Sequence, residues 1–120
     1  MSKNKGKDYS ASQENDIARL LGGKVQSNSG GTRFGGGDVQ TSTFFIEAKT
    51  LTKEQTSFSI KKEWIDKMKE QAFEQGKHHS SLAFRFAPDG EDYFVIDRRL
   101  MKELVSHLER GEDDECDRQA

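Results

Sequence analysis

Two acidic residues and a lysine are the side chains of this chain best suited to do chemistry. Asp38 follows three consecutive glycines, and Glu47 and Lys49 come nine and eleven residues after it. Magnesium prefers oxygen ligands and needs only one or two carboxylates when a substrate phosphate completes its coordination. Asp38 and Glu47 supply such ligands, and the backbone carbonyl of Ala48 is expected near the same ion. Lys49 would orient or help deprotonate a metal-bound water and stabilise charge on the phosphate, so the sequence predicts a magnesium site for phosphodiester hydrolysis.

Two predicted strands position these residues. The runs 38–40 and 43–49 are rich in β-branched and aromatic residues, which predicts an antiparallel hairpin with a tight turn between them. Glu47 and Lys49 are separated by one residue, so on a strand they point to the same face. The alternative is an exposed cross-strand charge pair, because a Glu-x-Lys tripeptide arises easily by chance in a chain rich in both residues.

The rest of the chain is predicted to alternate between helices and strands. Ser10 and Gln13 have the spacing of a capping box, which predicts a first helix over about 11–21 that ends at Gly22. Further elements are predicted as a short strand at 24–27, a helix at 59–75 capped by Ser59 and stopped by Gly76, strands at 82–86 and 93–96, and a last helix capped by Asp97. This order predicts an α/β fold with a central mixed β-sheet flanked by helices.

The pattern Gly-Asp, then a strand that ends in Glu-Ala-Lys, then a helix resembles the PD-(D/E)xK nuclease superfamily. The loop from Ser27 to Thr32 is similar to that of archaeal and phage Holliday-junction resolvases. The resemblance covers about residues 12–86 and implies a restriction-endonuclease-like core. It implies that Asp38, Glu47 and Lys49 are catalytic, that Glu14 completes the metal site, and that the ion is Mg²⁺ or alternatively Mn²⁺. Gly37 stands where the superfamily motif has its proline, and Gln71 would be a supporting polar residue on the following helix.

Glu14 also has support from helix geometry. It lies three and seven residues before Ile17 and Leu21, so it shares the face that packs toward the sheet. An acidic residue on an inward face needs a partner or a metal. The alternative is an exposed position in the first helical turn, where acidic residues interact favourably with the helix dipole.

Candidate DNA contacts lie on both sides of the hairpin. The segment 28–37 contains five of the eleven glycines, and it lacks the Gly-Lys-Ser/Thr of a nucleotide-binding loop. We expect a loop that approaches a DNA backbone, with phosphate contacts from Ser29, Thr32 and Arg33. Lys61 and Lys62 are further candidates. Plain flexibility of the loop and a solvated charged helix face are the alternatives.

Composition divides the chain into three predicted parts: a flexible basic arm at 1–11, a nuclease domain at 12–110 and an acidic disordered tail at 111–120. The formal net charge is −2, yet residues 1–110 hold 18 basic and 16 acidic residues and are therefore mildly basic. The single cysteine excludes a disulfide framework within one chain. The sequence contains no apolar run of membrane-spanning length, so an intracellular protein with no membrane partner is expected. The resemblance to small nucleases implies the cytoplasm of a prokaryotic or phage-infected cell.

The candidate metal site predicts a metal-dependent DNA endonuclease, and the resemblance implies that it cuts branched DNA. Geometry and the resemblance together predict a homodimer, because resolving a four-way junction needs two symmetrically placed cuts. A different nuclease of the superfamily, for repair, restriction or phage exonuclease activity, is the first alternative. A non-catalytic DNA-binding module on the same fold is the second. A structural interaction domain that dimerises through its last helix is the third.

Overall fold

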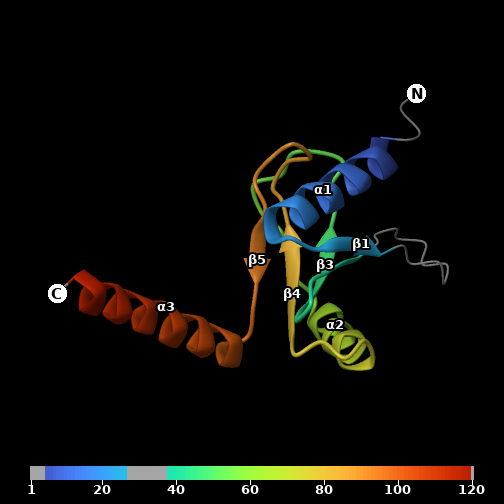
Figure 1. Ribbon diagram of the computed structural model, residues 1–120. Helices are drawn as coiled ribbons and strands as arrows, with labels where there is room; N and C mark the ends of the chain where they lie inside the picture. Colours follow the sequence, from blue (N-terminus) through green and yellow to red (C-terminus); the bar gives the residue numbers. More distant parts are fainter. Residues whose placement is uncertain (1–4, 27–37, 120) are drawn as a thin grey trace.

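The computed structural model describes residues 5–26 and 38–119. They form a five-stranded sheet with a helix against each face and a third helix that extends away from it (Figure 1). In chain order the elements are α1 (Lys5–Leu21), β1 (Lys24–Gln26), β2 (Asp38–Gln40), β3 (Phe44–Lys49), α2 (Lys62–Glu74), β4 (His79–Phe84), β5 (Tyr93–Val95) and α3 (Arg98–Gln119). The predicted α/β fold with a mixed central sheet is confirmed.

The strands lie side by side in the order in which they occur along the chain. β1 and β2 pair antiparallel, as do β2 and β3; β3 and β4 pair parallel, and β4 and β5 pair antiparallel. Parallel strands need a long crossover connection, and the segment containing α2 provides it. The predicted hairpin is present, and its turn is closed by a hydrogen bond from Thr41 N to the carbonyl of Phe44, at 3.0 Å.

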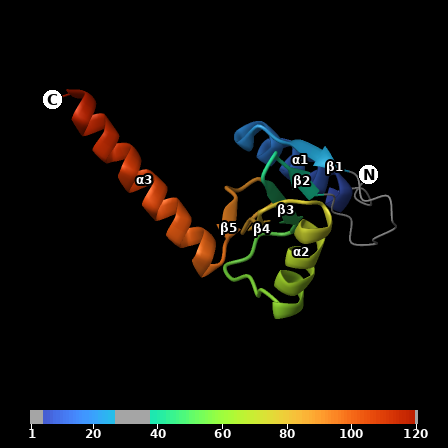
Figure 2. The same ribbon diagram turned by 60° about the horizontal axis from the view of Figure 1, so that its bottom comes forward.

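The two faces of the sheet have separate apolar cores. Alternate residues of β3 point to opposite faces. Ile46 packs with Ile17 of α1, whereas Phe45 packs with Met68 of α2. The sheet is therefore the middle layer between α1 and α2, as the two views show (Figures 1 and 2).

The ends of α1 and α2 follow the glycine predictions, but the starts of these two helices do not. Gly22 and Gly76 both have φ of 71°, the left-handed conformation that glycine adopts without strain. After α2, Gly76 N donates to Phe73 O and Lys77 N to Ala72 O, which is the hydrogen-bond pair of a Schellman motif. The predicted cap at Ser59 is wrong, because α2 begins after Lys61 and has no side-chain cap.

The first and last helices are longer than the sequence predicted. α1 begins at Lys5, so Ser10 lies within the helix, where its hydroxyl donates to Glu14 instead of capping the helix N-terminus. α3 is capped by Asp97 as predicted, with Leu100 N donating to Asp97 Oδ1 at 2.9 Å. It continues to Gln119, so the segment 111–119 belongs to a helix rather than to a separate tail. Among the described residues, no helix has both the length and the apolar character needed to cross a membrane.

A buried polar cluster joins α1 to the segment that connects β4 to β5. Arg85 follows β4 and donates to Asp92 before β5, to Asp16 of α1 and to the carbonyl of Pro88. The Gln13 side chain of α1 donates to the same Asp92. The side chains of Arg85 and Asp92 are only 6% and 11% exposed, so this ion pair is shielded from solvent. The cluster ties elements that are far apart in the sequence.

Replacing Asp92 with alanine should lower the free energy of unfolding by about 3–5 kcal/mol, because it leaves the buried Arg85 guanidinium without its main partner. Urea denaturation would measure the loss. The matched control is Asp66→Ala, which breaks an exposed pair with Lys62 on α2 and should cost no more than about 1 kcal/mol. Equal losses in the two variants would contradict a structural role for the cluster.

Candidate active site

The register of the β2–β3 hairpin places Asp38 directly opposite Glu47. Directly opposed residues of an antiparallel pair lie on the same face of the sheet. Glu47 alternates with Ile46 and Ala48, whose side chains belong to the core under α1, so both carboxylates lie on the α2 face. α2 itself packs mainly on β3 and β4, so among the described helices none packs closely over the β2 part of this face.

Lys49 lies beside Glu47 on the same face. Its Nζ is 3.1 Å from Glu47 Oε2 and 4.4 Å from the centroid of the Trp64 ring of α2. A lysine over an indole face is attracted by the ring quadrupole. The ammonium group is therefore held between a carboxylate and an aromatic ring, and its side chain keeps access to solvent.

Asp38 is only 6% exposed. Burial raises the pKa of its carboxyl group above the usual range, the hydrogen bond from Gln40 Nε2 lowers it, and the charge of Glu47 raises it further. Removing an ionised carboxylate from water and placing it beside a like charge both favour the protonated form. A cation at this position would reverse both effects.

Glu14 joins this pair from α1 and is also 6% exposed. Burial is the main cause that raises the pKa of its carboxyl group, the hydrogen bond from Ser10 opposes the shift, and the charges of Asp38 and Glu47 add to it. Glu14 therefore lies within electrostatic range of both acids, on the inward face predicted from its spacing. Next to it, Gln13 accepts a hydrogen bond from Thr50 just after β3, which fixes this turn of α1 relative to the site.

The carboxylates suit Mg²⁺ in chemistry and in number. All the side-chain donors are oxygens, and two carboxylates with a substrate phosphate are sufficient for this ion. Within the described residues, however, no three Asp, Glu, His or Cys side chains converge closely enough to enclose a metal by themselves.

The remaining predicted residues have different positions. Ala48 lies between Glu47 and Lys49, with its side chain in the core on the α1 face, so a role in binding metal is left to its backbone carbonyl. Gln71 is half-buried on α2, and no hydrogen bond joins its side chain to the carboxylates among the residues described. Lys61 Nζ lies 5.7 Å from the Trp64 ring, and Lys62 pairs with Asp66. The roles of these residues stay predictions. Ser29, Thr32 and Arg33 lie outside the described residues.

Sequence reasoning missed two contributions to the site. Trp64 of α2 packs against the core on its face of the sheet and also contacts Lys49. Gln13 was assigned to a capping box, yet it forms long-range hydrogen bonds with Asp92 and Thr50. Nothing in the local sequence indicated either contact, because each joins elements that meet only in the folded chain.

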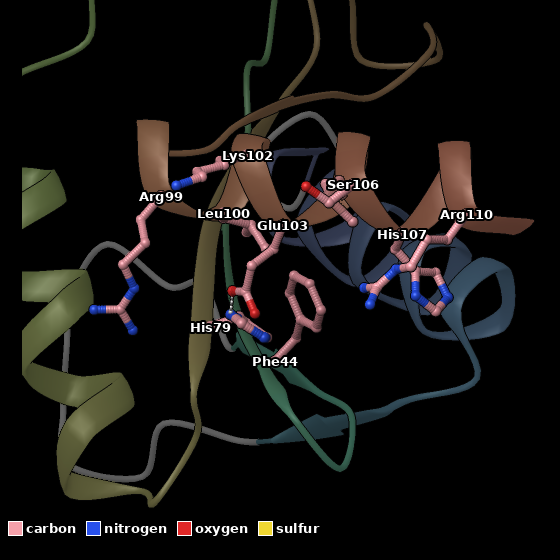
Figure 3. Close-up of a pocket in the computed structure, with 10 residues that line it drawn as sticks. Phe44, His79, Arg99, Leu100, Lys102, Glu103, Ser106, His107 and Arg110 are labelled. Atoms are coloured by element: carbon pink, nitrogen blue, oxygen red, sulfur yellow. Dashed lines mark ion pairs between the residues drawn. The ribbon is translucent and has the colours of Figure 1, made fainter.

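A groove at the base of α3 is separate from this site. Phe44 and His79 line it together with one face of α3, and His79 Nδ1 lies 3.7 Å from Glu103 Oε2 (Figure 3). Phe44 begins β3 and Lys49 ends it, so the two sites are roughly 17 Å apart along the strand. The groove therefore belongs to the α3 side of the molecule.

Comparison of the chain with protein-family models, with curated proteins and with solved structures gives no match.

The variants Glu14→Gln and Asp38→Asn should each raise the free energy of unfolding at neutral pH, by enough to increase the melting temperature by a few degrees. A carboxyl group whose pKa is higher in the folded state binds its proton more tightly there, so folding stability falls as the pH rises through that pKa. The gain should vanish below pH 3.8 to 4.5, the ordinary values of the two groups, where both states are protonated. Thermal unfolding across this pH range would measure it.

The matched control is Glu74→Gln on the exposed face of α2, which should leave both the stability and its pH dependence unchanged. If Glu14→Gln and Asp38→Asn behave like this control, the two carboxylates are not under electrostatic strain.

Proposed function

We propose that this chain is a metal-dependent DNA endonuclease with a restriction-endonuclease-like core, in which Asp38, Glu47 and Lys49 form the catalytic set. The observation that carries the proposal is the hairpin register, which sets two carboxylates opposite one another with a lysine ammonium beside them. The raised pKa of Asp38 and of Glu14 supports it, because buried like charges are stabilised by a cation. An ion pair with Lys49 alone would need only one carboxylate, whereas Asp38, Glu47 and Glu14 lie within electrostatic range of one another.

Each residue of the site would have a separate role in phosphodiester hydrolysis. Asp38 and Glu47 would hold Mg²⁺ or Mn²⁺ together with a phosphate oxygen, with Glu14 and the Ala48 carbonyl next to them. An ion bound there would supply a Lewis acid for the phosphate and an activated water. Lys49 Nζ would exchange its contact with Glu47 for hydrogen bonds to the attacking water and to the phosphate, where negative charge builds up. The Trp64 ring would keep the ammonium group in place during this exchange.

Branched DNA is the proposed substrate, and a second copy of the chain the proposed partner. One chain contributes one such site, whereas resolution of a four-way junction needs two cuts related by symmetry. α3 supports the pairing, because its side chains from Met101 onward form an exposed apolar stripe. This stripe consists of Met101, Leu104, Val105 and Leu108, with exposed fractions of 53, 39, 39 and 66%.

A second copy of α3 would cover this apolar stripe, as a two-fold symmetric interface requires.

A DNA-binding module that cuts nothing is the second candidate. The 3.1 Å contact between Lys49 Nζ and Glu47 Oε2 favours it, because a lysine that stays paired with this carboxylate occupies an oxygen that a metal would need. Cleavage assays separate this module from the endonuclease.

The purified protein should cleave a synthetic four-way junction in the presence of Mg²⁺ or Mn²⁺, in preference to flap, duplex and single-stranded DNA. Lys49→Ala and Asp38→Asn should each reduce the cleavage rate by at least about 100-fold, because the first removes a cation that would stabilise charge on the phosphate and the second removes a proposed ligand of the metal ion. Junction binding, measured by fluorescence anisotropy, should be retained in both variants. Asp66→Asn, an exposed acid on α2, is the control and should cleave normally.

Cleavage that survives Asp38→Asn would exclude the proposed site. Binding of the junction by the wild-type protein without cleavage under either ion would establish the non-cutting module instead.

The double variant Leu104→Glu, Leu108→Glu should convert a dimer into a monomer, because it places four charges in the proposed two-fold interface. Light scattering coupled to size exclusion would measure the mass in solution. Phe73→Glu is the control, since Phe73 is 85% exposed on α2 and outside α3. A wild-type protein that is monomeric at micromolar concentration would contradict the proposed pairing.

A further inference from the structure

An aromatic row crosses the α2 face of the sheet and begins at Lys49. The register places Lys49 of β3 beside Phe84 of β4, and Phe84 opposite Tyr93 of β5. Residues paired in this way point to the same face, so the three side chains form one line across the strands. Adjacent strands are about 4.8 Å apart, which puts Tyr93 roughly 10 Å from Lys49.

Further rings pack along this line. The Phe84 ring stacks with Phe58 at a centroid distance of 4.7 Å and with Tyr93 at 5.9 Å. Phe86 meets both Phe84 and Tyr93 edge to face. Phe58 also lies 6.2 Å from Trp64, the ring that holds Lys49, so the aromatic surface is continuous from the candidate active site to the edge of the sheet.

The outer end of the row is open. β5 is the edge strand, and α2 packs mainly on β3 and β4 (Figure 2). Tyr93 is 50% exposed although its inner neighbours Phe84 and Phe86 are half-buried. Tyr93 therefore contacts two neighbouring rings and still has half of its surface in solvent, which leaves it accessible to a further ring as a core residue is not.

The cationic groups next to the row suit the phosphate of a nucleotide. Lys49 and Lys61 both lie against the Trp64 ring, and each carries an ammonium group suited to a phosphate. Proteins that bind single-stranded DNA combine stacking rings with such cationic groups. A base within an intact duplex is stacked on its neighbours and cannot lie on a protein ring, whereas an unpaired base can.

We propose that the row ending in Tyr93 is a stacking subsite for an unpaired nucleobase close to the phosphate attacked at Lys49. The subsite selects DNA in which a base next to the cut is unstacked, as at a junction or a single-stranded branch. This inference rests on the proposed nuclease function for its meaning, but the binding that it describes is measurable without cleavage.

The test uses Asp38→Asn as a non-cleaving background and a single-stranded oligonucleotide that contains 2-aminopurine, whose fluorescence falls when the base stacks. Binding should quench the probe. Tyr93→Ala should abolish the quenching and weaken binding of the oligonucleotide by at least about fivefold, while binding of a blunt duplex stays unchanged. Tyr93→Phe should retain both properties, because it keeps the ring. Phe73→Ala is the matched control, an exposed ring outside the row.

Two results would overturn the subsite: quenching that persists in Tyr93→Ala, or equal weakening of single-stranded and duplex binding. Melting temperatures of the variants show whether the fold is intact. If Tyr93→Ala unfolds, quenching and oligonucleotide binding are compared between the wild-type protein and Tyr93→Phe instead. Cleavage by the wild-type protein is a separate arm. If quenching depends on Tyr93 but the wild-type protein cleaves nothing, the nuclease function is rejected and the subsite is retained. If the protein cleaves DNA but quenching does not depend on Tyr93, the nuclease function is retained and the subsite is rejected.

Discussion

The pairing of β2 with β3 sets Asp38 opposite Glu47, and this enforced proximity of like charges governs the rest of the site. The two strands cannot shift by one residue without moving Val39 and Ile46 out of the core under α1. The fold therefore holds the carboxylates together against their repulsion, and Glu14 from α1 adds a third negative charge. Such an arrangement lowers stability in the absence of a cation and would be favourable in its presence, which is the basis of the proposed metal site.

The surrounding structure holds this arrangement from two sides. On one face, the hydrogen bonds of Gln13 and the ion pair between Arg85 and Asp16 fix the position of α1. The position of Glu14 therefore depends in part on residues that follow β4. On the other face, Trp64 of α2 supports Lys49 from behind. The aromatic row extends from this lysine to the edge strand. Asp38, Glu47, Lys49 and the proposed base subsite thus share the α2 face of the sheet, while Glu14 approaches from the α1 side.

Local patterns in the sequence predicted the parts of this fold that depend on local physics. The hairpin followed from its β-branched and aromatic runs, and the helix ends from Gly22 and Gly76, which adopt a backbone conformation that most residues avoid. Ser10 and Gln13 misled the prediction of the first helix because their side chains bond within the helix and to distant partners instead of to its N-terminus. Arg85 and Asp16 are 69 residues apart in the sequence, so local residue spacing could not predict their ion pair. The metal, the DNA contacts of Ser29, Thr32 and Arg33, and the dimer stay predictions.

The most direct measurement is an NMR titration of the side-chain carboxyl carbons of Glu14 and Asp38, with and without Mg²⁺. Without the ion, each pKa should lie above the ordinary value of 4.5 or 3.8, because burial and like charges favour the protonated form. Saturating Mg²⁺ should lower both pKa values and shift both resonances, while the carboxyl resonance of Asp66, on the exposed face of α2, should not move on addition of the ion. Ordinary pKa values that do not respond to Mg²⁺ would contradict the account, since the carboxylates would then be neither strained nor available to a cation.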